Sequence, residues 1–393
     1  MVLGGSFAGM TAAIELRKRL GDEHDVTMLS KAKDFLFTPS LIWVPFGHRT
    51  REDISFPLAP VMEKKGIALK SVEVVRIDLR ERFVRDHTGE KTPYDYLVIA
   101  TGPKLDFDNV RGTGPSRFTQ SIFSWEDAER ARLAFERFVS EPGPVVVGAV
   151  QGAENFSAAY EFLFNMAHEL GKRNLRARAP LTFVTAEPFL GHFGVGGVGR
   201  GQKLVQAFFE RHAIEHVVSA KVSEVTHDTV HLEGGRRIPF SYAMFAPRFL
   251  GQEPVRALTE IATETGFVKV DDHYQTAAFP EVYAAGVAVH VEPAGETPVP
   301  CGVPKTGYLS EEMGRVVAHN IAATIHGEPL VSLPPGSINA KLLLDAGDDG
   351  LIMSSERLVT PGNDAWVVPG PEAHWAKVAF EKYFLMTHRR GRV

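Results

Sequence analysis

The strongest constraint on the fold lies at the start of the chain. Two apolar residues, Val2 and Leu3, lead into the run Gly4-Gly5-Ser6-Phe7-Ala8-Gly9, and an apolar helical pattern follows to Leu16. This order predicts a strand, a tight turn and a helix, in which the backbone can approach a pyrophosphate and free N–H groups face its phosphates. Because Ser6 stands where the G-x-G-x-x-G pattern has a glycine, an ordinary strand-to-helix turn stays open as the alternative.

Composition narrows the class of protein. A length of 393 residues predicts two or three domains, and a net charge of -5 argues against a dedicated nucleic-acid binder. The single cysteine, Cys301, excludes an internal disulfide, a zinc-finger array and a CxxC redox pair. No stretch approaches the roughly 18 uncharged apolar residues of a membrane-spanning helix.

Two further strands point to the same ligand as the first turn. The strand at Asp25 to Leu29 is followed by Ser30 and Lys31, where a dinucleotide fold usually has an acid for the ribose, although a hydroxyl can also bind ribose. A buried strand ending at Ala100 runs into Thr101 and Gly102, which again lets the backbone approach a cofactor. The aromatic stretch Phe35 to Pro45 favours a loop over a flat ligand, with a plain core segment as the alternative.

A second nucleotide-type fold begins at the strand Val145 to Val147. Its glycine pattern is incomplete, because Val150 and Ala153 replace the second and third glycines. A side chain at the second position obstructs a pyrophosphate, so the sequence disfavours NAD(P)H binding here. The zinc-protease pattern H-x-x-E-H also occurs, from His212 to His216, but we expect its histidines on a helix end and a strand, so no metal site is predicted.

Two segments near the C-terminus carry candidate chemistry. Lys305, Thr306 and Gly307 lie at a predicted helix start, where N–H groups and an ammonium group suit a polarised carbonyl or a flavin pyrimidine ring, and a solvated charge is the alternative for Lys305. The last segment, His374 to Val393, combines an apolar aromatic arc with lysines and arginines. That combination is typical of an interfacial membrane anchor, and a terminal helix docked on the body is the alternative.

With these motifs placed, nearly the whole chain resembles the sulfide:quinone oxidoreductases, which are membrane-associated members of the FAD-dependent disulfide reductase superfamily. The resemblance rests on IATGPK, GPVVVGAVQGA, AYEF, EPFLGHFGVGGVG, TPVPCGVPKTGY and AKVAFEKYF. It implies an α/β fold with two Rossmann-like domains and a C-terminal amphipathic membrane-associating segment. The implied parts are an FAD-binding domain (1–104 and 249–335), a degenerate NAD-type domain (105–248) and a quinone and membrane segment (336–393).

The resemblance also assigns residues. It implies that FAD is held by Gly4, Gly5, Ser6, Phe7, Ala8, Gly9, Ser30, Lys31, Thr101, Gly102, Gly286, Lys305 and Thr306, with Pro39 near the isoalloxazine ring. The quinone would lie near Asn339, Lys377, Phe380 and Tyr383. His192 and Glu161 match polar residues near the sulfide side and are candidate proton carriers, or else satisfied core groups.

The departures from the family concern the electron donor. Where its redox cysteines align, this chain has Phe123, Asn155 and Leu342, and a persulfide relay needs thiolates. Cys301 lies where the family has no catalytic cysteine, so a structural thiol is favoured over a catalytic one. We therefore expect a flavoenzyme with FAD that reduces a quinone from a small inorganic or organic donor at the cytoplasmic face of the membrane. An NADH:quinone oxidoreductase, a non-catalytic flavin-binding protein and a homo-oligomer stay open.

Overall fold

A parallel five-stranded sheet forms around the N-terminal strand in the computed structural model, which describes residues 1–359 and 365–393. Its strand order is β19-β9-β1-β2-β5, and Val2 pairs with Met28 on one side and Val98 on the other. The first turn therefore lies at the carboxyl edge in the middle of the sheet. The strands are β1 (Val2–Leu3), β2 (Thr27–Leu29), β5 (Ala68–Lys70), β9 (Leu97–Ile99) and β19 (Val282–Ala284).

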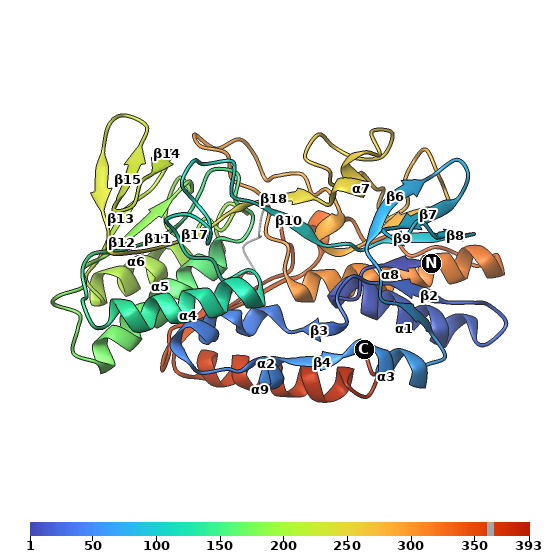
Figure 1. Cartoon of the computed structure of the whole chain (residues 1–393), viewed down its shortest axis with the longest axis horizontal. Helices are drawn as coiled ribbons and strands as arrows, with labels where there is room; N and C mark the ends of the chain where they lie inside the picture. The colour runs from blue at the N-terminus through green and yellow to red at the C-terminus, as the bar shows by residue number, and fades with distance from the viewer. Residues whose placement is uncertain (360–364) are drawn as a thin grey trace.

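Two long helices pack together beside this sheet, α1 (Phe7–Leu20) and α8 (Gly307–His326) (Figure 1). Their approach is close because α8 presents Gly314 to α1, where an added Cβ would lie 2.6 Å from the Ala8 carbonyl oxygen. The short helix η2 (Gly286–Ala288) follows β19 and also lies against α1 and α8. The start of α8 is thereby held next to the start of α1.

A second parallel sheet has the order β13-β12-β11-β17 and is flanked by three helices at the other end of the molecule (Figure 1). Every residue of its central strand β11 is buried, which explains the uninterrupted apolar run there. The elements are α4 (Trp125–Phe138), β11 (Val145–Ala149), α5 (Phe156–Lys172), β12 (Leu181–Thr185), α6 (Gly201–Arg211), β13 (Ile214–Val217) and β17 (Tyr242–Ala246).

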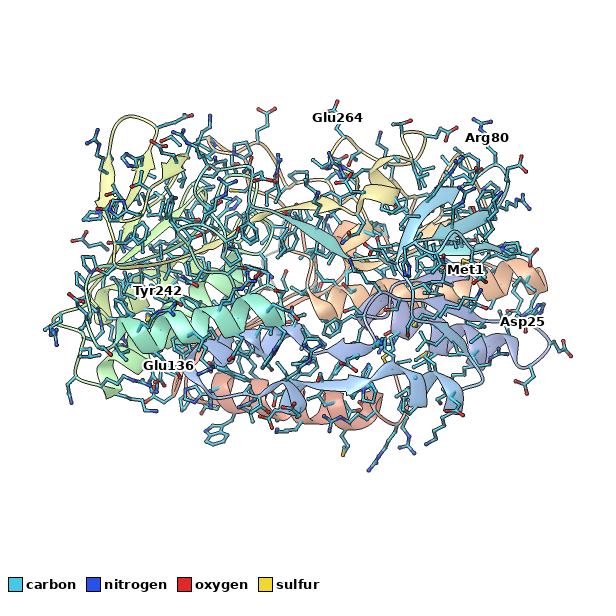
Figure 2. The ribbon with its side chains drawn as sticks, in the orientation of Figure 1. Met1, Asp25, Arg80, Glu136, Tyr242 and Glu264 are labelled. Atoms are coloured by element: carbon cyan, nitrogen blue, oxygen red, sulfur yellow. The ribbon has the colours of Figure 1, made fainter. Side chains whose placement is uncertain are left out.

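Smaller elements join and decorate the two sheets. The antiparallel pair β10 (Pro103–Asp106) and β18 (Arg248–Gly251) crosses between the two sheets (Figure 1). The remaining elements of this part are β6 (Val74–Asp78), β7 (Phe83–Asp86), β8 (Lys91–Pro93), β14 (Val222–Val225), β15 (Thr229–Leu232), β16 (Arg237–Pro239) and α7 (Glu253–Arg256). Charged side chains such as Asp25, Arg80, Glu136 and Glu264 point outward at the periphery (Figure 2).

The prolines of the aromatic stretch at 35–45 suggested an irregular loop, but the structure has regular elements there. It forms β3 (Asp34–Leu36), paired with β4 (Ser55–Pro57), and then the 3-10 helix η1 (Thr38–Phe46). Pro39 is tolerated because it lies in the first turn, where its missing N–H is not needed, whereas Pro45 lies inside the helix near its end. The helices α2 (Arg51–Ile54) and α3 (Leu58–Lys64) follow.

The C-terminal part forms an antiparallel sheet and a long helix. The sheet contains β20 (Ala340–Asp345), β21 (Gly350–Ser355) and β22 (Trp366–Pro369), preceded by the short helix η3 (Pro335–Ser337). The helix α9 (Glu372–His388) runs along the lower edge of the molecule beneath α2 and β4 (Figure 1). Among the described residues, no helix has both the length and the apolar character needed to cross a bilayer.

The apolar residues of the C-terminal helix lie mostly on its outward side, not against the body. The side of α9 that faces the body carries buried Lys377, Glu381 and His388, whereas Trp375 and Tyr383 are about two-thirds exposed. Apolar residues other than Phe384 and Leu385 thus lie largely outward and ionisable ones inward. The alternative drawn from the sequence, a helix docked on the body through its apolar side, is therefore not what the structure has.

Candidate active site

The first turn has the geometry of a phosphate cradle. Gly4 has φ +108°, and a Cβ there would lie 2.1 Å from the Ala100 carbonyl oxygen; a Cβ on Gly9 would lie 2.0 Å from the Gly4 carbonyl oxygen. Ser6 has φ -94°, which any residue adopts, so a serine is compatible with the turn despite the altered motif. Its side chain makes no capping bond, and the first turn of α1 contains no acidic residue. The free N–H groups of this turn are therefore available to an anion, because neither a capping side chain nor an acidic residue occupies them.

Two hydroxyl groups at the same sheet edge are available to a ligand. Ser30 is buried beside the turn, since a Cβ on Gly5 would lie 2.8 Å from its Oγ, which donates to the Ala32 carbonyl and keeps its lone pairs free. Thr101 Oγ1 is buried without a hydrogen-bond partner among the described residues. A buried hydroxyl normally has a partner, so the Thr101 hydroxyl is available to a polar group of a ligand. These features fit the pyrophosphate and ribose of a dinucleotide, whereas the exposed Lys31 already pairs with Glu73 at 2.8 Å.

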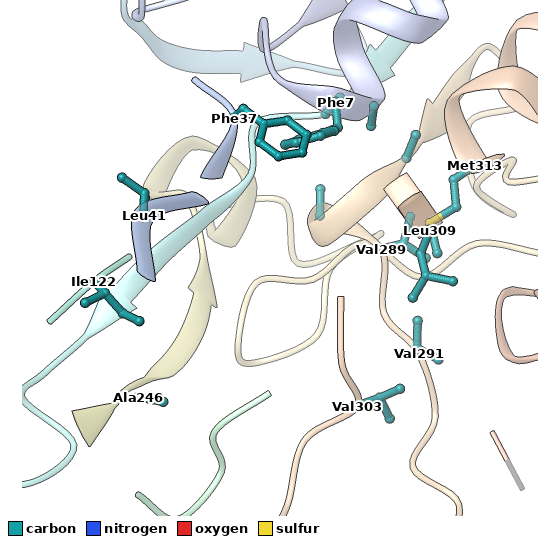
Figure 3. Close-up of a cluster of buried hydrophobic side chains, with 14 of the residues drawn as sticks. Phe7, Phe37, Leu41, Ile122, Ala246, Val289, Val291, Val303, Leu309 and Met313 are labelled. Carbon is teal, nitrogen blue, oxygen red and sulfur yellow. The ribbon is translucent and has the colours of Figure 1, made fainter. Parts of the chain in front are cut away.

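Apolar side chains from both halves of the molecule gather beyond the cradle (Figure 3). Phe37 and Leu41 flank Pro39 at the start of η1, and Phe7 begins α1. The group drawn in the figure contains Phe7, Phe37, Leu41, Ile122, Ala246, Val289, Val291, Val303, Leu309 and Met313, all buried. Such walls suit a flat aromatic ring.

A buried ammonium group lies at the start of α8, where Thr306 is the N-cap. Lys305 Nζ lies 3.3 Å from the Val287 carbonyl oxygen and 3.1 Å from the centre of the Phe267 ring. Burial lowers the pKa of Lys305 to about 7, and the charge of Glu154 opposes this shift. The same loop region is tight at Gly286, whose φ is +70° and where a Cβ would lie 2.8 Å from the Ala8 Cβ.

Glu154 is a functional candidate that sequence reasoning missed. It is buried just after the Gln151-Gly152-Ala153 turn, and its Oε2 accepts a hydrogen bond from the Phe249 N–H at 2.8 Å. Burial raises the pKa of Glu154 to about 7, while Lys305 acts in the opposite direction. An acid directly before Asn155, the position aligned with a redox cysteine, was the available signal.

The positions aligned with the redox cysteines have structural roles here. Asn155 caps α5 through its Oδ1, which accepts from the Ala158 N–H and the Ser157 hydroxyl. Phe123 packs edge-on against Phe249, with ring centres 5.8 Å apart, and Leu342 is a partly buried residue of β20. Cys301 is half-buried, and burial raises its pKa to about 12. A thiol with that pKa stays protonated at neutral pH and is a poor nucleophile.

In the second sheet, the acid at the ribose-binding position of a nucleotide fold, Glu187, points into the protein. Glu187 lies just after β12, where an acid would bind a ribose, but it is fully buried and accepts hydrogen bonds from the Tyr160 and Thr185 hydroxyls and the Phe193 N–H. Burial raises the pKa of Glu187 to about 7. His192 lies in the same loop, and its Nδ1 accepts from the Gly194 N–H while burial lowers its pKa. The His192 ring therefore lies in the loop that follows Glu187 and is bonded within that loop.

A second buried ionic pair lies beneath α9. Lys377 Nζ contacts Glu161 Oε1 at 2.5 Å, and that oxygen also accepts from the Asp345 N–H at 2.9 Å. Burial raises the pKa of Glu161 to about 7, and Lys377 opposes the rise. Phe380 packs on Phe37 with ring centres 5.7 Å apart, which links α9 to the apolar walls. Of the four residues assigned to the quinone, Lys377 is buried and Phe380 is at the rim, whereas Tyr383 and Asn339 are exposed.

The sequence pattern H-x-x-E-H is divided between elements, as expected. His212 follows the last residue of α6, and His216 lies in β13. A surface cavity of about 590 Å³ lies nearby, at the carboxyl edge of the second sheet. Gln151, Lys221, Arg248 and Pro300 are among its lining residues.

Comparisons with known proteins match this architecture. The model of the pyridine nucleotide-disulphide oxidoreductase family matches residues 1–299. The chain is 35% identical over 399 residues to a sulfide-quinone reductase of Aquifex aeolicus, covering 100% of this chain and 91% of that protein. The X-ray structure of the sulfide:quinone oxidoreductase from Aquifex aeolicus superposes with a TM-score of 0.95 at 36% identity, covering 100% and 91% of the two chains. A Mycobacterium tuberculosis NADH dehydrogenase-like protein is 24% identical over 345 residues, covering 85% and 82%.

Proposed function

The chain belongs to the pyridine nucleotide-disulphide oxidoreductases and, within them, to the sulfide-quinone reductases, and we propose that it passes two electrons from hydrosulfide through FAD to a quinone without a cysteine relay. It is an FAD-dependent oxidoreductase. The observation that carries the proposal is the buried Lys377–Glu161 pair on the acceptor side. On the donor side, Glu154 and Lys305 are the buried ionisable groups, and no thiol replaces the aligned cysteines.

The residues of the first sheet edge fit FAD. The N–H groups of the first turn of α1 would bind the pyrophosphate, Ser30 the ribose, and Thr101 a polar group of the cofactor. When bound, FAD supplies a ring that takes up two electrons from a donor and gives them to an acceptor. Lys305 would place its N–H groups at the pyrimidine end of that ring.

On the donor side, the residues can handle an anion and a proton. Two hydrosulfide ions that give up two electrons form one hydrodisulfide ion and release one proton. Lys305, when charged, attracts the anionic donor, and Glu154 accepts the released proton because its raised pKa lies near neutral pH. Because burial raises the pKa of Cys301 to about 12, sulfur is not carried on the protein in this proposal.

On the acceptor side, a quinone needs two electrons and two protons to become a quinol. Lys377 and Glu161 hold protons in a buried position between α9 and the body of the protein. Phe380, packed between α9 and the aromatic walls, can stack on a quinone ring. The pair therefore supplies protons where water is excluded.

We also propose that the protein sits peripherally on the cytoplasmic face of the membrane through α9. The outward residues Trp375, Tyr383 and Met386 are half to two-thirds exposed, and the exposed Lys382, Arg389 and Arg390 lie among and beyond them. Aromatic and apolar side chains suit the acyl boundary, and cations suit lipid phosphates. Because inward polar contacts hold α9 on the body of the protein, these outward residues are not needed for that attachment.

NADH is the second candidate donor. The surface cavity at the second sheet and the resemblance to an NADH dehydrogenase-like protein favour it. Against it, Val150 is buried in the glycine turn and the oxygens of Glu187 are bonded inside the protein, so they do not face a ribose.

Anaerobic mixing of the FAD-loaded protein with each donor tests the proposal. Hydrosulfide is expected to bleach the flavin absorbance, and a soluble short-chain quinone is expected to restore it. NADH at the same concentration should leave the flavin oxidised over that time. Bleaching by NADH but not by hydrosulfide would establish the second candidate instead.

A further inference from the structure

A second surface cavity, of about 520 Å³, lies beside the C-terminal end of α9, where that helix meets α2, β4 and α3. These elements lie together along the lower edge of the molecule (Figure 1). The volume falls within the range of about 300–1,000 Å³ that is typical of sites for small ligands. Asp34, Arg51, Glu52, Phe56, Val61 and Arg389 are among its lining residues.

The floor of this cavity is apolar and well packed. Phe56 and Val61 are each 5% exposed, and the Phe56 ring stacks on Phe35 with ring centres 5.0 Å apart. Met386, which is half exposed, lies three residues before Arg389 and thus on the same side of α9. The cavity therefore has an apolar floor and lies close to an outward apolar side chain of α9.

Two arginines line the cavity and retain unused N–H donors. Arg389 Nη2 donates to the carbonyl oxygens of Ser55 and Glu52 at 3.0 and 3.3 Å, which fixes the guanidinium group. Its Nε and Nη1 make no hydrogen bond to the described residues. Arg51 Nη2 lies 3.6 Å from Asp34 Oδ2, which is too far for a hydrogen bond. Both guanidinium groups can therefore bind the oxygens of a phosphate group.

The same cavity also has two carboxylates. Asp34 is 39% exposed and Glu52 is exposed, and neither side chain accepts a hydrogen bond from a residue that the structure describes. The charges of these two acids cancel those of Arg51 and Arg389, so the lining does not favour a purely anionic ligand. A ligand that carries both a phosphate and an ammonium group is complementary to all four side chains.

We propose that this cavity binds the headgroup of a zwitterionic phospholipid, with its phosphate on Arg51 and Arg389 and a primary ammonium on Asp34 and Glu52. The inference rests on the proposed attachment of α9 to the membrane. A primary ammonium has three N–H donors for the carboxylates, whereas the trimethylammonium of choline has none. The cavity therefore selects phosphatidylethanolamine over phosphatidylcholine.

Each half of the headgroup has its own variant. Asp34→Asn combined with Glu52→Gln weakens the acceptors for the ammonium and keeps the shape of both side chains. Arg51→Gln removes a donor for the phosphate, which both lipids share. Glu264→Gln and Arg80→Gln are the matched controls, because both residues are exposed and lie at the opposite edge of the molecule from α9 (Figure 2).

Flotation of the FAD-loaded protein with vesicles tests the inference. Adding phosphatidylethanolamine to phosphatidylcholine vesicles is expected to tighten binding of the wild type about tenfold, which is what one charge-assisted hydrogen bond contributes. The double acid variant should bind both vesicles equally, and Arg51→Gln should bind both more weakly than the wild type does. Soluble glycerophosphoethanolamine should remove the preference of the wild type, whereas glycerophosphocholine and inorganic phosphate at the same concentration should not. Both controls should behave like the wild type.

Three results would overturn the inference. Equal binding of the wild type to the two kinds of vesicle shows that the cavity does not recognise the ammonium group. A preference that persists in the double acid variant comes from the packing of the bilayer and not from the cavity. If the wild type binds no vesicle, the membrane attachment fails and the headgroup site fails with it. Reduction of a soluble quinone by the same sample tests the proposed electron transfer separately.

Discussion

Thr101 has a buried hydroxyl that a ligand at the carboxyl edge of the first sheet would satisfy. Its hydroxyl is buried and unpaired among the described residues, next to the close approach of Gly4 and Ala100. Leaving a buried hydroxyl unpaired costs about 1–3 kcal/mol. The apo-protein bears that cost, and a bound cofactor with a polar group at this position removes it.

Thr101→Val should therefore have opposite effects on apo-protein stability and on FAD affinity. We expect the free energy of unfolding of the apo-protein to rise by about 1 kcal/mol and FAD binding to weaken about tenfold. Denaturant unfolding and a fluorescence titration with FAD measure the two quantities. Thr11→Val is the control, because Thr11 Oγ1 in α1 is also buried and unpaired, and we expect it to leave FAD affinity unchanged. Equal FAD affinity in both variants would contradict the assignment.

At the residue scale, the sequence predicts the cradle but not the buried charges. The glycines of the first turn are visible in the sequence because only glycine fits there. An added Cβ would lie 2.1 Å from the Ala100 carbonyl oxygen at Gly4 and 2.0 Å from the Gly4 carbonyl oxygen at Gly9. Glu154 gave no such signal, because its hydrogen-bond partner Phe249 and the charge of Lys305 come from distant parts of the sequence. Asp345 also gives no signal in the sequence, because its contacts with Trp43 and His374 come from other elements.

At the element scale, α9 is the part of the chain whose composition and docking disagree most. The sequence predicts an apolar arc in this helix. The inward side, however, is held by ionic contacts such as Lys377 to Glu161 and His388 to Glu311. Phe384 is the main inward aromatic and packs against Phe7, Phe35 and Phe37. The periodic pattern could locate the helix but could not reveal which side faces the protein.

Removing outward apolar side chains from α9 should release the protein from membranes. Trp375→Ser combined with Met386→Ser is expected to reduce binding to anionic liposomes at least about tenfold, because each side chain buries apolar area in the lipid boundary. Reduction of a soluble quinone should be unchanged. Phe118→Ser, which removes a comparably exposed aromatic outside α9, should leave liposome binding intact. Liposome flotation measures the effect, and wild-type binding by the α9 variant would refute the membrane proposal.

At the scale of the whole molecule, the interior holds three glutamates whose pKa values burial raises to about 7, namely Glu154, Glu161 and Glu187. Each binds its proton more tightly in the folded protein than in the unfolded chain, where the value is 4.5. Stability from these groups is therefore greatest at low pH and falls as pH rises from about 4.5 to about 7. The lowered pKa values of His192 and His212 act in the opposite direction at the upper end of this window.

The apo-protein should consequently lose stability between about pH 4.5 and pH 6. We expect a fall of about 1 kcal/mol per glutamate per pH unit, an upper bound because partial relaxation exposes the groups to water. Glu154→Gln should remove roughly a third of the fall, because the amide has no proton to lose. Thermal unfolding at several pH values measures the change. A stability that rises steadily over this window would contradict the burial of these groups as neutral acids.

In the proposed mechanism, two groups of buried ionisable residues serve two different steps at one cofactor site. Glu154 and Lys305 lie between the two sheets, whereas Glu161 and Lys377 lie where α5 meets α9. Phe380, which lies three residues after Lys377, packs on Phe37, and Figure 3 shows Phe37 among the apolar walls. The fold was predictable from its two strand–turn–helix units, but this division of acids between the two sides depends on contacts that no local pattern encodes.

The central claim is that hydrosulfide oxidation by this protein needs no thiol, and one variant tests it directly. Cys301→Ser leaves a chain without any cysteine. We predict that the FAD-loaded variant reduces a soluble quinone with hydrosulfide at the wild-type rate under anaerobic conditions. Loss of that activity, with FAD still bound and with dithionite-reduced flavin still reoxidised by quinone, would contradict the claim and place the donor chemistry on Cys301.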